Sequence, residues 1–126
     1  MILVVNAGSS SIKVAVYQPD LTLVMAGQVS GIGGALAHLS LGDADMDVAA
    51  PDHDSALRVI LTSLARQGIE VTALTAAAHR VVHGGTSLVQ PTPVTDDVIA
   101  GIEAAIPLAP LHNPNNLAGI RALPAL

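Results

Sequence analysis

The stretch Val4–Val14, VVNAGSSSIKV, places an asparagine, a glycine and three serines between two apolar runs. The run Ile2–Val5 is continuous, which is typical of a strand buried on both faces. After the polar residues, Ile12, Val14 and Val16 recur at every second position, which is the period of a strand. The sequence therefore predicts two strands joined by a polar turn.

This polar turn carries groups suited to an anion. In an extended chain Ser9, Ser11 and Lys13 lie on one face, so hydroxyls and an ammonium gather there. Gly8 lets the backbone turn sharply and lets a ligand approach the amides, which makes the turn a candidate phosphate site. Asn6 can offer its amide oxygen to a hard cation such as Mg²⁺. The stretch is no P-loop, because it leads into a strand, and an ordinary hydrophilic turn remains the alternative.

The composition bounds the class of protein. The 126 residues fit one domain, and 51% hydrophobic against 12% charged residues argues against disorder. A net charge of −5 disfavours a nucleic-acid partner. No apolar run is long enough for a membrane helix, and the N-terminus lacks the basic region of a signal peptide. The single aromatic residue, Tyr17, means that the core must be aliphatic. The absence of cysteine excludes disulfides and thiolate metal sites and fits a cytoplasmic protein.

Alternation predicts that the first half of the chain is an antiparallel meander. The turn signal Gln18–Asp20 precedes a third alternating run that starts at Leu21. A weaker pair of strands is expected at about Ala35–Leu41 and Met46–Ala50, with the polar GDAD stretch between them.

The second half of the chain alternates helices with a strand, so the whole is predicted to be α/β with a mixed sheet. The first helix is expected to begin after an Asp54 N-cap and to stop at Gly68. A buried strand is expected over Ala76–Val82, a helix after the N-cap Thr95, and a last helix from Asn113–Pro114. Helical spacing marks the buried positions as Leu57, Ile60, Leu61 and Leu64 in the first helix and Ile99, Ile102 and Ile106 in the second.

Arg80 lies in an apolar stretch just before a glycine pair. Its guanidinium is well shaped for a carboxylate or a phosphoryl group. The alternatives are an ion pair with a buried acid, or an arginine that simply reaches solvent. The nearby His79 and His83 have metal-ligand spacing only in a helix, so in this strand we expect hydrogen bonding in the core instead.

Prolines surround His112 in the stretch Pro107–Asn116. A histidine at a junction between loop and helix can stabilise charge that develops on a transferring group. The spacing alone favours the simpler interpretation, in which Asn113 and Pro114 start a helix and His112 is exposed.

Three motifs in this order resemble the N-terminal part of the acetate/propionate kinase family. They are NAGSSSIK at Asn6–Lys13, HRVVHGG at His79–Gly85 and LAPLHNPNNL at Leu108–Leu117. The resemblance implies a ribonuclease-H-like mixed sheet with flanking helices, the fold of the sugar kinase/Hsp70/actin superfamily. It also implies reversible transfer of the ATP γ-phosphoryl group to acetate, which gives acetyl phosphate and ADP in the presence of Mg²⁺ or Mn²⁺.

The resemblance implies roles on the phosphate side of the site for the first motif. Asn6 matches a residue that helps to position the metal and the phosphates. Ser9 and Ser11 match hydroxyls of the phosphate-side loop, and Lys13 matches its lysine.

On the acid side, Arg80 matches an arginine that holds the carboxylate and the phosphoryl group in transfer. Val82 and Leu111 match residues that line the pocket for the methyl group of the acid. His112 matches a histidine thought to stabilise the transition state.

The sequence departs from the family by stopping at Leu126. The family continues into a strand with a catalytic aspartate and then into a domain that binds adenosine and forms most of a homodimer. We therefore expect residues 1–126 to be an incomplete N-terminal domain that is inactive alone, because transfer needs both substrates held in place. The alternatives are a non-catalytic module that binds a phosphate or a partner, and a kinase for another short acid such as propionate.

Overall fold

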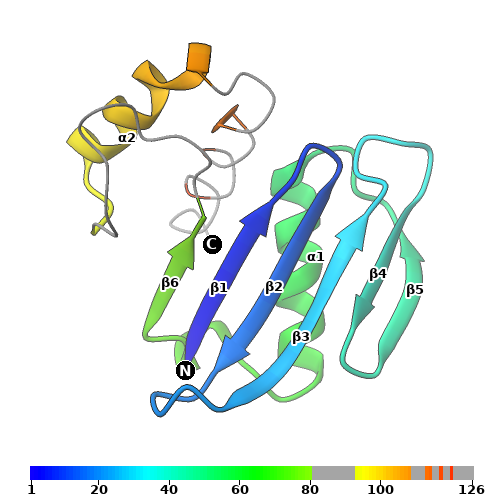
Figure 1. Ribbon diagram of the computed structural model, residues 1–126. Coiled ribbons are helices and arrows are strands. Elements are labelled where there is room, and N and C mark those ends of the chain that lie inside the picture. Colours follow the sequence, from blue (N-terminus) through cyan, green and yellow to red (C-terminus); the bar gives the residue numbers. More distant parts are fainter. Residues whose placement is uncertain (81–92, 109–112, 115–116, 118–119, 121–126) are drawn as a thin grey trace.

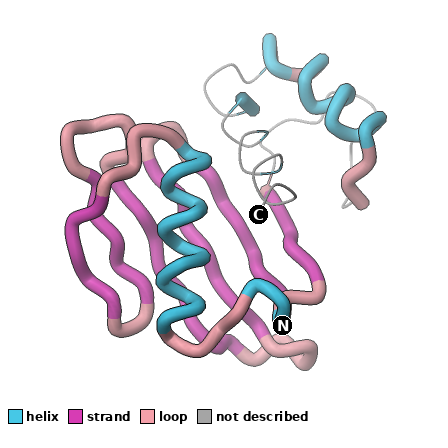
Figure 2. The backbone as a smooth tube through the Cα atoms, turned by 180° about the vertical axis from the view of Figure 1, so that it is seen from behind, coloured by secondary structure: helices cyan, strands magenta, loops and turns pink. Residues whose placement is uncertain are grey.

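The computed structural model describes residues 1–80, 93–108, 113–114, 117 and 120. Within them a six-stranded sheet has the order β5-β4-β3-β2-β1-β6, and helix α1 crosses one face of it (Figures 1 and 2). The elements are β1 (Ile2–Ala7), β2 (Ser11–Tyr17), β3 (Leu23–Ser30), β4 (Ala37–Leu41), β5 (Ala44–Val48), α1 (His53–Arg66), η1 (Val71–Ala73), β6 (Ala76–His79), α2 (Asp96–Ala104) and η2 (Ile106–Leu108).

The first five strands form the predicted antiparallel meander, and β6 then pairs in parallel with β1. The predicted mixed sheet is thus confirmed. The β4–β5 pair spans Ala37–Leu41 and Ala44–Val48, so several boundaries shift from the prediction, and two of the shifts have a clear cause. The third strand starts at Leu23 because Leu21, with a φ of +70°, still belongs to the preceding turn. The β4–β5 turn is confined to Gly42 and Asp43, because the φ of +57° at Gly42 reverses the chain at once and lets Ala44 begin the next strand.

The core lies between the sheet and α1. Alternate residues of β1 and β2 face the helix and are buried, and the predicted apolar stripe of α1 is buried against them. The central members of this cluster are Leu3, Val5, Ile12, Val14, Val16, Val29, Leu57, Ile60, Leu61 and Leu64. The prediction that Ile2–Val5 is buried on both faces is wrong. Ile2 and Val4 are only partly buried, because no described helix covers the second face of the sheet.

Helix α1 begins two residues earlier than predicted. Asp52, not Asp54, is its N-cap, and its carboxylate accepts a hydrogen bond of 2.8 Å from the backbone N–H of Ser55. Asp54 lies in the first turn instead and pairs with Arg58, with 3.0 Å between Oδ2 and Nε. The predicted stop is confirmed, because Gly68 follows the C-cap with a φ of +92°.

Strand β6 is shorter and more exposed than the predicted buried strand Ala76–Val82. It ends at His79, and its three alanines are exposed because, in the described part of the chain, β6 is the last strand of the sheet and pairs only with β1. Residues 81 and 82 lie outside the described part of the chain.

Helix α2 lies beyond the carboxyl end of β6 (Figure 1) and belongs to a second, smaller apolar cluster. Its predicted N-cap Thr95 is confirmed by a hydrogen bond of 3.3 Å from the N–H of Val98 to the threonine Oγ1. Of the predicted stripe, Ile102 is buried, whereas Ile99 and Ile106 are partly buried around it. Asn113 and Pro114 are helical, as predicted, and the Asn113 side chain donates to the carbonyl of Ile102 at 3.4 Å. Among the helices described, none combines the length and the hydropathy that a bilayer crossing requires.

The two aspartates at the start of α1 should differ in their effect on stability. Asp52→Ala removes a cap hydrogen bond and should lower the free energy of unfolding by about 1 kcal/mol. Asp54→Ala removes only an exposed pair and should cost about 0.3–0.5 kcal/mol. Urea denaturation followed by circular dichroism measures both variants, and equal losses would contradict the assignment of the cap.

The β4–β5 hairpin should respond to pH through His38. Its Nδ1 lies 3.0 Å from Oδ1 of Asp47, and its Nε2 lies 2.5 Å from Oδ1 of Asp45. These hydrogen bonds raise the pKa of His38, and the bond to Asp47 has the larger effect. The folded state therefore holds this proton more tightly than the unfolded state, whose histidine titrates at about 6.5. The resulting stabilisation is complete below that pH and is lost as the pH rises through the raised pKa.

We expect the imidazole resonances of His38 to titrate with a midpoint above that of an unfolded histidine. His38→Gln should reduce the fall in unfolding free energy on the alkaline side of that value. A midpoint at or below the ordinary pKa would contradict the arrangement.

Candidate functional site

The turn between β1 and β2 is closed by the backbone. The N–H of Gly8 donates to the carbonyl of Ser11 at 2.8 Å, and Ala7 pairs with Ile12 just below it. Ser9 and Ser10 are exposed at the tip of the turn. Ser9 lies outside β2, so only Ser11 and Lys13 share the strand face that the sequence assigned to all three residues.

The carbonyl groups of the turn point into the protein. The carbonyl of Gly8 accepts a hydrogen bond of 2.7 Å from Nε2–H of His53, and the carbonyl of Ser10 accepts one of 2.9 Å from the N–H of Ile32. Among the described residues, no backbone carbonyl accepts from the N–H of Ser9 or Ser10. Two of its carbonyls are thus engaged inside the protein, whereas Ser9 and Ser10 lie exposed with no backbone acceptor for their N–H groups among the described residues, and unpaired donors of this kind favour an anion.

Gly8 is required for a different reason from the one expected. Its φ is not positive, so the turn does not use the freedom that glycine has in the left-handed region. Instead, a Cβ at this position would lie 3.0 Å from Oγ of Ser11. A larger residue here would therefore displace the Ser11 hydroxyl.

One row across the strands β2, β1 and β6 holds Lys13, Asn6 and Arg80. Asn6 pairs directly with Lys13 across β1 and β2. The N–H of Arg80 donates to the carbonyl of Val5 at 3.0 Å, so the β1–β6 register, continued by one residue, places Arg80 beside Asn6. Both cations are exposed, and within the described residues neither has an ion pair. This arrangement does not support the alternative in which Arg80 pairs with a buried acid.

His79 faces away from this row. It pairs with Val5, whose side chain lies on the α1 side of the sheet, and burial lowers the pKa of His79. His79 is half-buried on this face, and the hydrogen bonding expected of its side chain stays a prediction. His83 lies outside the described residues, as do the predicted site residues Val82, Leu111 and His112, whose roles stay predictions.

The residues at the turn fit a phosphate better than they fit a metal ion. Asn6 offers one neutral amide oxygen, whereas Mg²⁺ is usually held by one or two carboxylates together with phosphate oxygens and water. Across the described residues, histidines and acidic side chains form no group of three that could hold a metal ion. Asn6 therefore supplies one ligand at most, and the turn supplies donors for a phosphate.

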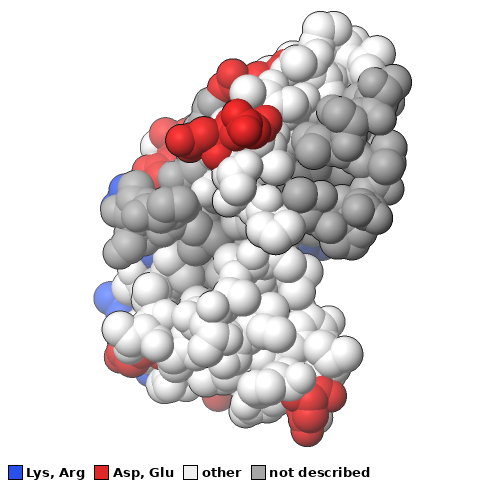
Figure 3. Space-filling view, turned by 90° about the vertical axis from the view of Figure 1, so that its left-hand side faces the viewer, with Lys and Arg blue, Asp and Glu red and all other residues white. Residues whose placement is uncertain are grey.

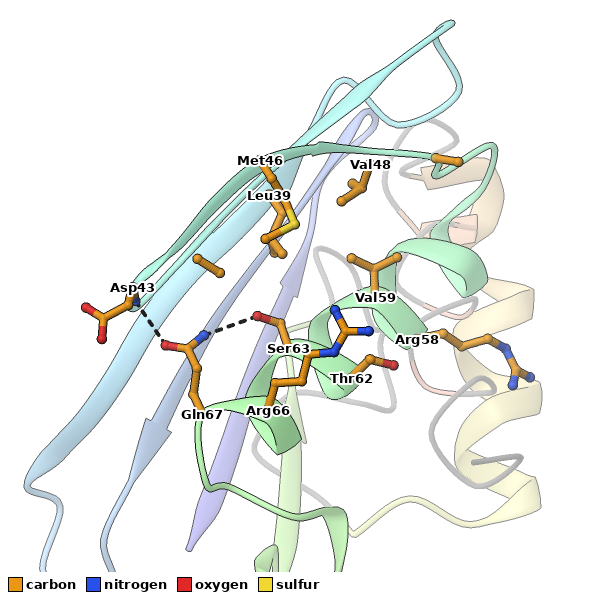
Figure 4. Close-up of a pocket in the computed structure, with 12 residues that line it drawn as sticks. Leu39, Asp43, Met46, Val48, Arg58, Val59, Thr62, Ser63, Arg66 and Gln67 are labelled. Carbon is orange, nitrogen blue, oxygen red and sulfur yellow. Dashed lines mark hydrogen bonds between the residues drawn. The ribbon is translucent and has the colours of Figure 1, made fainter.

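A second concave region lies between α1 and the β4–β5 hairpin, on the opposite side of the sheet from the Asn6 row (Figure 4). This groove of 560 Å³ has an apolar floor, and Arg58 and Arg66 stand at its helical wall. Gln67 bridges one end, accepting from the N–H of Asp43 at 2.9 Å and donating to Ser63 at 3.1 Å. Sequence patterns did not indicate this groove, because its residues come from elements that only folding brings together.

Charged side chains are sparse on the side of the molecule that carries β6. Figure 3 shows them there as separate groups with a broad uncharged surface between them.

His53 is a contributor to the site that sequence reasoning missed. It is 8% exposed and occupies the first helical position after the Asp52 cap. The available signal was a histidine directly after a capping residue, which by itself does not indicate contact with a turn 45 positions earlier.

Comparison with known proteins gives consistent relatives over the whole chain. A family model described as the acetokinase family matches residues 1–126. The chain is 42% identical to an acetate kinase of Streptomyces avermitilis, covering 99% of this chain and 33% of that protein. It is 41% identical to an acetate kinase of Geobacillus kaustophilus, covering 96% of this chain and 32% of that protein.

Solved structures agree with this result. The crystal structure of Porphyromonas gingivalis acetate kinase superposes with a TM-score of 0.93 at 35% identity, covering 99% of this chain and 34% of that one. A propionate kinase from Francisella tularensis gives a TM-score of 0.86 at 29% identity, covering 96% and 32%. The chain thus spans about a third of the length of these relatives. These neighbours confirm the predicted fold class, and because the family model extends over all 126 residues, the chain belongs to the acetokinase family.

Proposed function

We propose that this chain is the N-terminal domain of an acetate kinase and supplies the phosphate side of its active site. The observation that carries the proposal is the β1–β2 turn, where the Gly8 and Ser10 carbonyls accept hydrogen bonds inside the protein, while Ser9 and Ser10 are exposed residues whose N–H groups have no backbone acceptor among the described residues. Lys13 and Arg80 lie on the row beside this turn and add two exposed cations. Membership of the acetokinase family supports the choice of reaction.

The proposed reaction is attack of an acetate oxygen on the γ-phosphorus of ATP. The new bond forms between that oxygen and phosphorus, the bond to the β–γ bridging oxygen breaks, and ADP leaves with the electron pair. Ser9, Ser11 and Lys13 donate hydrogen bonds to phosphate oxygens, and Arg80 neutralises charge on the transferring group and the carboxylate. Asn6 would contribute one oxygen to Mg²⁺ or Mn²⁺, which supplies charge neutralisation when bound with the nucleotide.

Three further roles in the proposal come from the resemblance alone. Val82 and Leu111 line the pocket for the methyl group of the acid, and His112 stabilises the transition state. All three lie outside the described residues.

The rest of the proposed protein lies beyond these residues. The chain matches about a third of each relative, so we propose that residues 1–126 form an N-terminal domain truncated before a strand with the catalytic aspartate. A nucleotide-binding domain would follow and would form most of a homodimer. The absence of cysteine supports a cytoplasmic location.

Two alternatives remain within reach of experiment. A kinase for another short acid is favoured by the structural similarity to a protein described as a propionate kinase. A non-catalytic module would use the same turn to bind a phosphate ligand or a partner, without turnover.

The isolated chain should not produce acetyl phosphate. Purified protein of 12.7 kDa, with its mass confirmed by mass spectrometry, is incubated with ATP, Mg²⁺ and either acetate or propionate. We expect no turnover, because residues that hold the nucleotide are proposed to lie in the following domain. Turnover at this mass would refute the proposed division of the site, and the preferred acid would then identify the substrate.

The isolated chain should nevertheless bind phosphate at the turn. In a titration with inorganic phosphate followed by ¹H–¹⁵N NMR, the amides of Ser9 and Ser10 should shift. Lys13→Ala and Arg80→Ala should each weaken binding by about tenfold, the loss expected when one charge-assisted hydrogen bond to an exposed ligand is removed.

Arg66→Ala is the matched control, because Arg66 is an exposed arginine on α1 with no ion pair among the described residues. It should leave phosphate affinity unchanged. An equal effect of all three substitutions would indicate general charge attraction and would count against a specific site.

A further inference from the structure

We propose that His53 is a positioning residue that sets the conformation of the β1–β2 turn and thereby aims the Ser9 and Ser10 amides at a phosphate. The phosphate part of this inference rests on the proposed function. The positioning part rests on the described contacts alone.

The first observation is the hydrogen bond from Nε2–H of His53 to the carbonyl of Gly8, at 2.7 Å. His53 is buried and Gly8 is half-buried, so the bond is partly shielded from water, and its loss would leave the carbonyl less well satisfied. A peptide unit is planar, so fixing the Gly8 carbonyl also fixes the direction of the N–H of Ser9, which belongs to the same peptide.

A second contact holds the carbonyl of Ser10, so the peptide that carries the N–H of Ser10 lies between two held peptide units. The N–H of Ile32 donates to the carbonyl of Ser10 at 2.9 Å, and Ile32 is itself buried. The adjacent N–H of Gly33 donates to the carbonyl of Ala50 at 3.0 Å. The turn is thus held at two points by segments that are bonded to each other.

The start of α1 closes this arrangement. Ala50 is buried two residues before Asp52, which caps the helix, and His53 follows at the first helical position. The backbone at His53 is therefore held by the Asp52 cap and by the hydrogen bond from Gly33 to Ala50. The position of the helix start thus sets the position of the imidazole, and the imidazole holds the Gly8 carbonyl of the turn.

The chemistry of the contact defines the required state of the ring. A carbonyl accepts only, so Nε2 must carry a proton, in either the neutral Nε2–H tautomer or the imidazolium. Glutamine places an amide N–H₂ near the position of Nε2, whereas asparagine places it near Nδ1, too short to reach Gly8. These two amides therefore form a matched pair that differs in reach.

The first test uses the unsubstituted chain. Long-range ¹H–¹⁵N NMR should show a proton on Nε2 of His53. A neutral ring protonated only on Nδ1 would overturn the inference without any variant.

The second test compares His53→Gln with His53→Asn. In the asparagine variant the ¹⁵N order parameters of Ser9 and Ser10 should fall, and phosphate should bind about tenfold more weakly. The glutamine variant should retain the order parameters and stay within about threefold of the original affinity. Equal behaviour of the two variants at the turn, with both folded by circular dichroism, would overturn the positioning role.

The two readouts separate this inference from the proposed function. Order parameters that fall in His53→Asn, together with an unsubstituted chain that binds no phosphate, would uphold the positioning role and refute the phosphate site. Phosphate binding that is the same in the two variants would uphold the site and refute the role of His53.

Discussion

The packing of α1 against one face of the sheet is the contact on which the rest of the structure depends. The chain has no phenylalanine or tryptophan, so burial is achieved by aliphatic side chains of β1, β2, β3 and α1 that interlock in one layer. This layer fixes which face of each strand is inward. It therefore also fixes the outward row of Asn6, Lys13 and Arg80, because neighbours in register share a face.

The same helix links the core to the candidate site. Its apolar stripe packs on the sheet, and its first residue, His53, contacts the Gly8 carbonyl. A change in how α1 sits on the core would thus reach the turn directly. The turn is thus joined to the core although Ser9 and Ser10 at its tip are exposed.

The row of Asn6, Lys13 and Arg80 and the groove beside α1 have different chemistry. The row beside the turn offers hydrogen-bond donors and cations on the open face of the sheet. The groove beside α1 has an apolar floor on the opposite side, and Gln67 bridges one end (Figure 4). Phosphoryl transfer requires charge neutralisation, so the donor row is the region that matches the chemistry of the family.

The sequence by itself determined the meander and the apolar stripe of α1, because alternation and helical spacing are local properties of the chain. It also carried the resemblance to the family, which rests on three short motifs. It also placed Ser11 and Lys13 on one strand face, since they lie two positions apart, whereas its placement of Ser9 on that face is wrong. Only the tertiary structure decided that Asp52 caps α1, that β6 is an exposed edge, and that His53 contacts Gly8. The cap is a local contact, but Asp52 and Asp54 are both capping residues, and the local pattern does not choose between them. The edge position of β6 and the contact of His53 with Gly8 depend on which distant segments meet, and this is set by the packing of the whole core.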